Sequence, residues 1–170
     1  RRESNKGDRQ VSISVGDKIP DVKVMVATGE GPQAVQTGEL LGQGKVALFS
    51  VPGAFTPTCS AKHLPGFVEK ADELKSKGVD KIVCMSVNDA FVMDAWGKNQ
   101  NASDKVVMMA DGNGDFARAV GLTMDGKGFG MGERAQRFSA VIENGEVKHL
   151  NVEAPGAFDV SSAEHMLGQL

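Results

Sequence analysis

A cysteine with the setting of a nucleophile lies in the run "VPGAFTPTCSAKHLPGF", from Val51 to Phe67. Thr56 is a good residue to cap the N-terminus of a helix, and Pro57 suits the first helical position. Cys59 then falls in the first helical turn, where backbone N–H groups are unpaired and the helix dipole is positive. Both features stabilise a thiolate, which is the nucleophilic form of cysteine. The segment therefore predicts a reactive thiol at the start of a helix.

The helix start alone is too weak to keep such a thiol ionised. A free cysteine is only about 3% thiolate at pH 7, and making the thiolate dominant takes about 3.4 kcal/mol. A helix dipole supplies about 0.3–1 kcal/mol in an exposed setting. A cationic side chain and direct hydrogen bonds to the sulfur are therefore also required. Without them Cys59 would be an inert core residue, since free cysteines are among the most buried residue types.

Strands and helices alternate along the chain around this segment. Two continuous apolar runs, Lys45–Pro52 and Lys81–Val87, have the pattern of strands that are buried on both faces. Pro57–Lys77 predicts a helix that Pro65 interrupts. The other predicted strands are 11–15, 21–28 and 105–111. The other predicted helices are 88–99, behind an Asn88/Asp89 cap, 115–120, and 161–170, with Ser161 and Glu164 at capping-box spacing. A hairpin is predicted at 137–153, with its turn at Asn144-Gly145. This order predicts one α/β domain with a mixed central sheet flanked by helices, a class that includes the thioredoxin-like folds.

Length and composition fit a single soluble domain. The chain has 170 residues, 41% of them hydrophobic and 24% charged. A net charge of −3 argues against nucleic acid or an anionic membrane as the main partner. No apolar run reaches the roughly 18–20 residues that span a bilayer, and we expect no secretory signal. Residues 1–10 are polar and unpatterned, so we predict a disordered arm there and one domain at 11–170.

The two cysteines and three histidines predict no metal site. Zinc would need both cysteines and at least two of His63, His149 and His165, and no pair of them has the spacing of a zinc finger. Two cysteines are also too few for a disulfide scaffold. They fit thiol chemistry in a reducing compartment, so we expect the protein in the cytoplasm or inside an organelle, a mitochondrion or plastid.

The eight residues Pro52–Cys59, "PGAFTPTC", carry the motif P-x-x-x-T-x-x-C of the peroxiredoxins. The longer run from Val51 to Lys98 resembles the type II, or peroxiredoxin 5, subfamily, and its plant-type members most of all. The resemblance continues through "MADGNGDFARAVGL", "RFSAVIENGEVKHLNVE" and "SSAEHMLGQL". It covers nearly all of the chain except the N-terminal arm and the loop at 29–36, and matches of this length are highly specific.

The resemblance implies a thioredoxin fold and a thiol-dependent peroxidase. Cys59 would be the peroxidatic nucleophile, which attacks hydrogen peroxide or an alkyl hydroperoxide and becomes a sulfenic acid. Thr56 would hydrogen-bond the sulfur and the peroxide, Pro52 would shield the site from water, and Arg137 would complete the site. Arg137 would also supply the required cation, and with Thr56 it would stabilise the charge that builds on both peroxide oxygens. The family further implies a homodimer, no cofactor, and recycling by glutaredoxin and glutathione or by thioredoxin.

His63 lies four residues after Cys59, on the same helical face. It could be the base of a Cys-His acyl-transfer dyad. No orienting acid or oxyanion element can be identified beside it, so a structural or electrostatic support role is favoured.

Cys84 lies 25 positions after Cys59, inside a predicted buried strand. It is either a packed core thiol or, as the plant-type resemblance implies, a resolving cysteine. A disulfide to Cys59 needs Cα atoms within about 7 Å, which would require the first helical turn to unwind. The other resolving position of the subfamily, near the C-terminus, reads "FDVSS" at 158–162 and has no cysteine. Direct reduction of the sulfenic acid by an external thiol is therefore the favoured alternative.

Two other activities would use the same cysteine. A thiol-disulfide oxidoreductase is disfavoured because the chain has no C-x-x-C. A redox sensor or holdase would use Cys59 without significant turnover, and turnover with a reductant separates it from an enzyme.

A glycine-rich run, Gly126–Gly132, precedes Arg137. It lacks the Lys-Ser/Thr ending of a phosphate-binding loop, so we predict a flexible loop that leads to Arg137. The resemblance places such a loop near a dimer interface, where it could gate the site.

Overall fold

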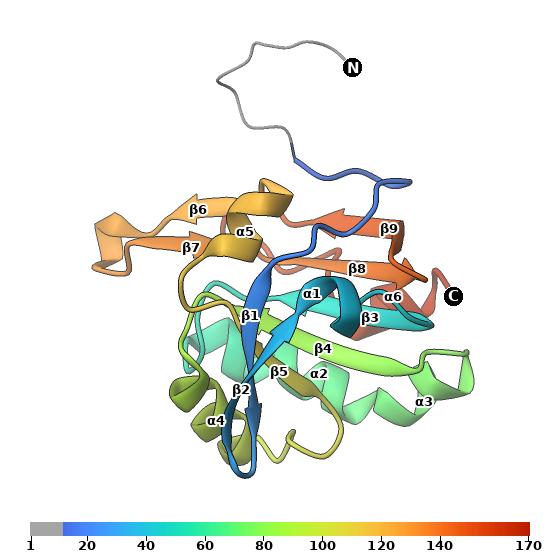
Figure 1. Cartoon of the computed structure of the whole chain (residues 1–170), viewed down its shortest axis with the longest axis horizontal. Helices are drawn as coiled ribbons and strands as arrows, with labels where there is room; N and C mark the ends of the chain where they lie inside the picture. Colours follow the sequence, from blue (N-terminus) through green and yellow to red (C-terminus); the bar gives the residue numbers. More distant parts are fainter. Residues whose placement is uncertain (1–11) are drawn as a thin grey trace, which may run out of the picture.

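The structure is a computed structural model that describes residues 12–170. Its centre is a seven-stranded sheet with the strand order β2-β1-β5-β4-β3-β8-β9, and β6 and β7 form a separate pair (Figure 1). The strands of the described part are β1 Lys23–Thr28, β2 Gly31–Gln36, β3 Lys45–Ser50, β4 Lys81–Ser86, β5 Val107–Ala110, β6 Thr123–Asp125, β7 Glu133–Ala135, β8 Phe138–Glu143 and β9 Glu146–Val152. The helical segments are α1 Thr37–Leu40, a π-helical turn η1 Cys59–His63, α2 Leu64–Glu69, α3 Ala71–Ser76, α4 Ala90–Asn99, α5 Asp115–Val120, a 3-10 turn η2 Lys127–Phe129, and α6 Ala163–Leu167. The predicted arm at 1–10 lies outside the described residues.

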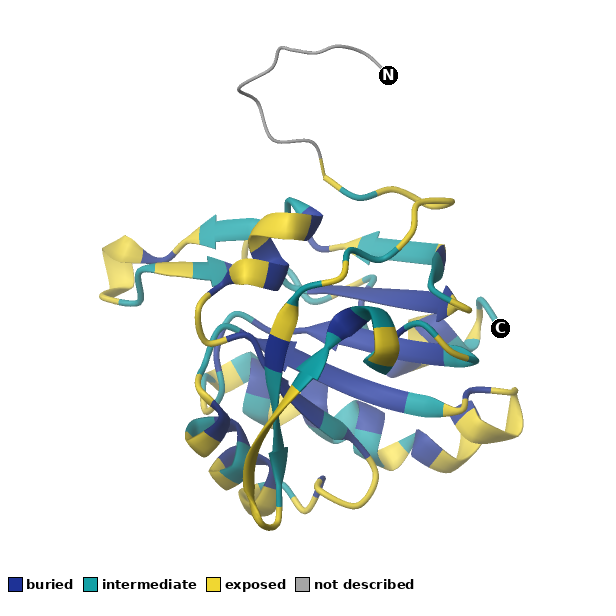
Figure 2. Cartoon of the chain, in the orientation of Figure 1, coloured by how far each residue is buried: buried dark blue, intermediate teal, exposed yellow. Residues whose placement is uncertain are grey.

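The central sheet is mixed, as predicted. β3, β4 and β5 run parallel, whereas β8 pairs antiparallel with β3 and β1 antiparallel with β5. Strands β3 and β4 are buried on both faces because helices cover the sheet on either side (Figure 2). Phe49 and Cys84 share a core with α2, α3, α4 and α6, and Leu48 and Val83 share one with α5. The arrangement confirms the predicted α/β, thioredoxin-like class.

Short-range signals in the sequence placed several elements correctly. Strands β1, β3, β4 and β5 and the β8–β9 hairpin fall within their predicted ranges. At the hairpin tip Asn144 and Gly145 have φ angles of 50° and 83°, as a two-residue type I′ turn requires. Of the predicted pair Asn88/Asp89, Asp89 caps α4, where its carboxylate accepts a hydrogen bond from Val92 N at 2.8 Å.

The predicted strand at 11–15 is wrong for its described residues, 12–15. Ser14 N donates to the Asp17 carboxylate at 2.9 Å, and Gly16 has a φ of 96°. The alternating apolar pattern is therefore cut short by a turn before it can pair along a neighbouring strand.

The helical segments also differ in detail from the prediction. The interruption at Pro65 takes the form of η1, in which Leu64 N donates to Cys59 O. A second break, at Lys70, has no signal in the sequence. The last helix is capped by Ser162, whose Oγ accepts from His165 N at 3.1 Å, and not by Ser161.

The glycine-rich run before Arg137 connects β6 to β7 and contains η2. Gly130 and Gly132 have φ angles of 69° and 67°, which favour glycine. The run is thus part of a short hairpin, and β7 at its far end leads directly to Arg137.

Candidate active site

The predicted motif lies where β3 ends and the long helical segment begins. Ser60 N donates to Thr56 O at 2.9 Å, so the helix starts at Pro57 as predicted. The Thr56 hydroxyl donates to Gly53 O at 2.7 Å, rather than to the Cys59 sulfur that the resemblance implies as its partner. Because a hydroxyl has one proton, this bond leaves the Thr56 oxygen only its capacity to accept a further hydrogen bond.

Cys59 is fully buried at the start of η1, with a cation on its sulfur. Arg137 Nη2 donates to Cys59 Sγ at 3.2 Å. The antiparallel register of β3 and β8 places Ser50 opposite Phe138, so the loop after β3 and the residue before β8 leave the sheet at the same end. The sheet thus brings together the thiol and the arginine that the sequence predicts.

His63 holds Arg137 in this position. His63 Nδ1 lies 2.8 Å from Arg137 Nη1, and His63 Nε2 lies 2.9 Å from Ser161 O. A guanidinium can only donate, so Nδ1 accepts and Nε2 carries the proton that Ser161 O receives. Burial and then the charge of Arg137 lower the pKa of His63 to about 3, and the ring is neutral at pH 7. Since both ring nitrogens are hydrogen-bonded, one to Arg137 and the other to Ser161 O, the geometry favours a support role over a Cys-His dyad.

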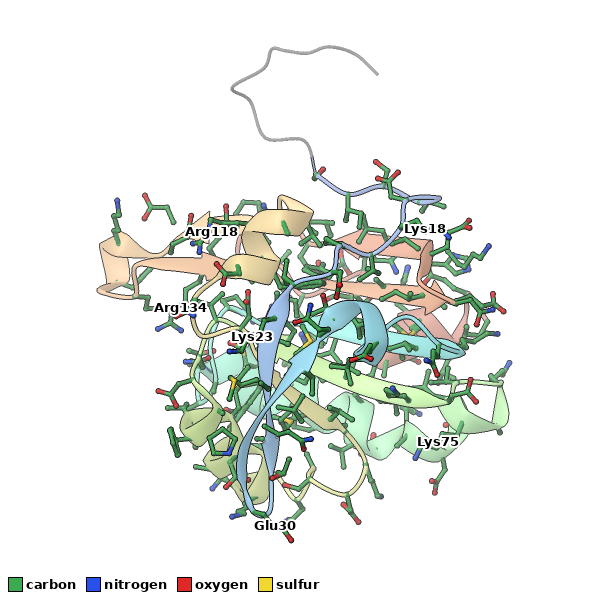
Figure 3. All side chains as sticks on the ribbon, viewed as in Figure 1. Lys18, Lys23, Glu30, Lys75, Arg118 and Arg134 are labelled. Carbon is green, nitrogen blue, oxygen red and sulfur yellow. The ribbon has the colours of Figure 1, made fainter. Side chains whose placement is uncertain are left out.

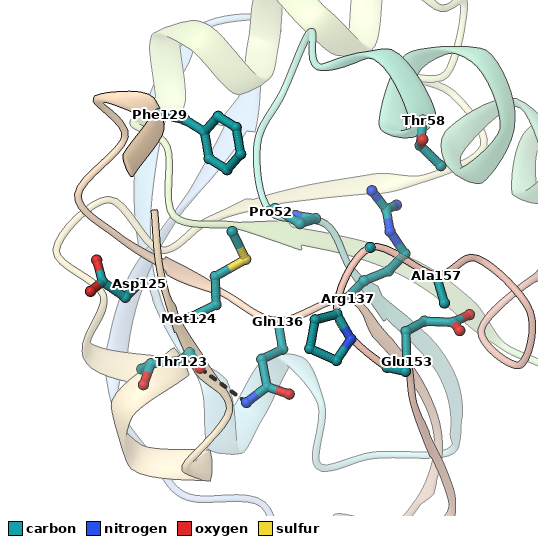
Figure 4. Close-up of a pocket in the computed structure, with 13 residues that line it drawn as sticks. Pro52, Thr58, Thr123, Met124, Asp125, Phe129, Gln136, Arg137, Glu153 and Ala157 are labelled. Carbon is teal, nitrogen blue, oxygen red and sulfur yellow. Dashed lines mark hydrogen bonds between the residues drawn. The ribbon is translucent and has the colours of Figure 1, made fainter. Parts of the chain in front are cut away.

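A cavity of about 710 Å³ lies beside Arg137 (Figure 4). Arg137 both lines this cavity and contacts the sulfur, and Pro52 and Thr58 form part of the same wall. Apolar side chains such as Met124 and Phe129 line the opposite side.

Within residues 12–170, no helix is long and apolar enough to cross a membrane. The same residues contain no group of three or more His, Cys, Asp and Glu side chains that could hold a metal ion.

Comparison with known proteins decides the family. The family model described as Redoxin matches residues 14–167, most of the chain. Peroxiredoxin-2E, chloroplastic, from Arabidopsis thaliana is 51% identical over 164 residues, which cover 94% of this chain and 70% of that protein. The chain belongs to the peroxiredoxins. Peroxiredoxin-2B from the same plant is 48% identical over 159 residues, which cover 93% of this chain and 98% of that protein.

A solved structure supports the same assignment. Reduced Prx3 from Vibrio vulnificus in complex with hydrogen peroxide is 52% identical, with a TM-score of 0.88, and the match covers 92% of this chain and 98% of that one. The predicted type II resemblance is confirmed. The chain is a peroxiredoxin and a thiol peroxidase that acts through a peroxidatic cysteine.

The second cysteine of this peroxiredoxin, Cys84, lies in the middle of β4. It is fully buried and pairs in register with Phe49 of β3 and Met108 of β5. Cys84 and Cys59 are both free thiols in one core. Burial raises the pKa of the Cys84 thiol well above its usual range, and the neighbouring Cys59 raises it further. Cys84 is thus a neutral thiol in a strand that is paired on both sides.

Two residues outside the predicted set hold the loop that precedes Cys59. Arg134, which extends from β7 (Figure 3), donates through Nη1 to Pro52 O at 3.2 Å and through Nε to Met131 O at 2.9 Å. Asn88 Oδ1 accepts from Ala54 N at 2.9 Å. Neither contact has a sequence signal, because each joins the loop to a strand end far away in the chain.

Proposed function

We propose that Cys59 is the peroxidatic cysteine of this peroxidase. The observation that carries the proposal is the hydrogen bond from Arg137 Nη2 to Cys59 Sγ at 3.2 Å. A guanidinium is always charged, so it favours the thiolate and supplies what the helix dipole alone lacks. Burial raises the pKa of the Cys84 thiol, which disfavours Cys84 as the nucleophile.

The proposed reaction begins with attack of the Cys59 thiolate on the terminal oxygen of the hydroperoxide. An S–O bond forms as the O–O bond breaks, the sulfur loses two electrons to become a sulfenic acid, and the leaving oxygen takes up a proton to give water or an alcohol. Negative charge moves from sulfur to both oxygens during this step. Donors fixed beforehand stabilise such a transition state most, and the Arg137 guanidinium already lies at the sulfur.

Thr56 and Pro52 are proposed to position and enclose the peroxide. The proton of the Thr56 hydroxyl is committed to Gly53 O, which leaves its oxygen free to accept the O–H of a hydroperoxide. Pro52 lines the cavity and has no N–H to attract water. The apolar cavity wall supports alkyl hydroperoxides, as well as hydrogen peroxide, as substrates.

The sulfenic acid is proposed to be reduced by an external thiol system, either glutaredoxin with glutathione or thioredoxin. This choice is supported by the burial of Cys84 in a central strand. The family resemblance supports a homodimer, and thiol chemistry of this kind suits a reducing compartment, the cytoplasm or an organelle.

The first test is to mix the reduced protein with one equivalent of hydrogen peroxide and follow Trp96 fluorescence by stopped flow. Trp96 Nε1 donates to Ser60 Oγ at 2.9 Å, so the indole reports on the residue next to Cys59. We expect oxidation far faster than that of a free thiol, lost in Cys59→Ser and retained in Cys84→Ser. Fast oxidation that persists in Cys59→Ser would exclude Cys59 as the nucleophile. Fast oxidation without turnover by either thiol system would instead support a redox sensor.

A further inference from the structure

A buried carboxylate anchors the segment behind the active-site histidine. Glu153, the residue after β9, is 7% exposed. Its Oε2 accepts hydrogen bonds from the backbone N–H groups of Asp159, Val160 and Ser161 at 2.7, 2.8 and 2.8 Å. The Ser161 hydroxyl donates to the same oxygen at 2.7 Å. Burial acts to raise the pKa of Glu153, but these hydrogen bonds outweigh it and lower the pKa. The side chain is therefore an anion that holds three consecutive residues.

Ser161 O and Arg137 together fix which nitrogen of His63 carries the proton. With Ser161 N and Oγ fixed on Glu153, Ser161 O accepts from His63 Nε2 at 2.9 Å. This leaves the lone pair on Nδ1, which is the atom that Arg137 Nη1 contacts at 2.8 Å. In the other tautomer an N–H would face the guanidinium, and two donors would repel each other. A fixed Ser161 O thus favours the tautomer in which Arg137 has an acceptor.

The His63 ring has little freedom to compensate for a change in this segment. Its centroid lies 4.9 Å from that of Phe49, 5.8 Å from Phe67 and 5.0 Å from Phe158. Phe158 directly precedes the three residues that Glu153 holds, 159–161. It also lies beside Arg137, whose Cζ is 5.8 Å from the Phe158 ring centroid. Figure 4 shows that the side chains of Arg137 and Glu153 leave neighbouring strand ends in different directions, Arg137 toward the helix that carries Thr58 and Glu153 toward Ala157. The Glu153 carboxylate therefore points away from the Arg137 guanidinium.

We propose that Glu153 is a positioning residue of the peroxidase, which acts through Ser161 and His63 to keep Arg137 on the Cys59 sulfur. The inference rests on the proposed role of Cys59. Glu153 also lines the cavity, and the proposed effect on Arg137 runs through Ser161 and His63. The backbone bond from Glu153 N to Arg137 O, at 3.0 Å, is retained when the side chain is replaced, so substitutions test the side-chain route alone.

The test is a double-mutant cycle on the rate of Cys59 oxidation by hydrogen peroxide, measured by stopped flow. Glu153→Ala is expected to slow oxidation at least about tenfold. Complete removal of an electrostatic donor typically lowers the rate by about 10²–10³-fold, so a smaller loss is expected for an indirect effect. His63→Phe keeps the aromatic packing and removes both nitrogens. If Glu153 acts through His63, adding Glu153→Ala to His63→Phe changes the rate less than about twofold. An equal loss in both backgrounds, or a wild-type rate in Glu153→Ala, would overturn the proposal.

Two further variants separate positioning from simple stability. Glu153→Gln keeps an oxygen for the four hydrogen bonds and is expected to retain most of the wild-type rate. Ser161→Ala removes only the hydrogen bond from the hydroxyl, so it is the matched control with a smaller expected effect. Should Glu153→Ala fail to fold, Glu153→Asp replaces it in the cycle, because the shorter side chain keeps the charge and withdraws the oxygen from Ser161.

Nitrogen NMR of His63 provides a readout that does not depend on peroxide. We expect Nε2–H in the wild type and in Glu153→Gln, and a mixture of tautomers in Glu153→Ala. An unchanged tautomer in Glu153→Ala would contradict the positioning role. If the wild type itself reacts slowly with peroxide, the proposed function of Cys59 fails, whereas a fast wild type with an additive cycle removes only the role of Glu153.

Discussion

Arg137 Nη2 lies 3.2 Å from Cys59 Sγ, although the two residues are 78 positions apart in the chain. The antiparallel pairing of β3 with β8 produces this contact, because it brings the residue before β8 to the end of the sheet where β3 leads into the helix. The helix start alone stabilises a thiolate too little. The cation that the proposed Cys59 thiolate requires is therefore supplied by the sheet register and not by the local motif.

Arg137→Lys tests whether the shape of the guanidinium matters in addition to its charge. Arg137 uses one nitrogen for Cys59 and another for His63, and a single ammonium cannot reproduce this fork. We expect oxidation of Cys59 by hydrogen peroxide to slow by about 10²-fold, as for the loss of one preorganised donor. Stopped-flow fluorescence measures the rate, and Arg118→Lys on the surface is the control. A wild-type rate in Arg137→Lys would show that charge alone suffices.

The buried neutral histidine makes stability depend on pH. Burial, and then the charge of Arg137, lower the pKa of His63 from 6.5 to about 3. Below about pH 6.5, His63 is therefore protonated in the unfolded chain but remains neutral in the folded chain. The free energy of unfolding should therefore fall as the pH drops from 6.5 toward 5, with a slope approaching about 1.4 kcal/mol per pH unit. Above about pH 6.5, His63 is neutral in both states and no longer makes the free energy of unfolding depend on pH.

Urea denaturation at pH 7.5, 6.5, 5.5 and 5.0 checks the slope. His63→Phe should lose it, and His165→Gln, which changes an exposed histidine, should keep it. The same pH dependence in the wild type and in His63→Phe would assign the effect to other groups.

Arg134 is expected to matter through the loop that it holds. Arg134→Met removes the hydrogen bond to Pro52 O and should slow peroxide oxidation by about tenfold, since a hydrogen bond from a charged donor contributes about 1.5–3 kcal/mol. Gly53→Ala tests the same contact from the other side, because a Cβ there would lie 2.9 Å from Arg134 Nη1. The rate constant with hydrogen peroxide is the measurement. Full activity in both variants would leave Arg134 with a purely structural role.

The product of one turnover distinguishes the two routes of recycling. Because Cys84 is buried in a strand paired on both sides, we expect one equivalent of peroxide to add one oxygen to the protein, with the same result in Cys84→Ser. Mass spectrometry and a count of free thiols check this. A loss of two hydrogens that disappears in Cys84→Ser would make Cys84 the resolving cysteine and show that η1 unwinds during the cycle.

Elements with a local signal were predictable from the sequence. The buried runs of β3 and β4, the Thr56-Pro57 helix start and the Asn144-Gly145 turn each depend on residues close together in the chain. The predicted strand at 11–15 shows the limit of such signals, since an alternating pattern forms a strand only where a partner is available to pair with it. The bond that the Thr56 hydroxyl makes to Gly53 O is likewise a matter of loop geometry, which the motif does not specify.

The sequence by itself determined the family, the identity of the candidate nucleophile and the need for a cation beside it. Only the tertiary structure decided how that cation is held. The series Cys59, Arg137, His63, Ser161 and Glu153 joins η1, the start of β8, the end of β9 and the segment before α6. His63 and Ser161 are 98 positions apart, and no periodicity or spacing connects them. Hydrogen bonds of this kind depend on sheet register and on the packing of loops at one end of the sheet, which form only when the whole chain folds.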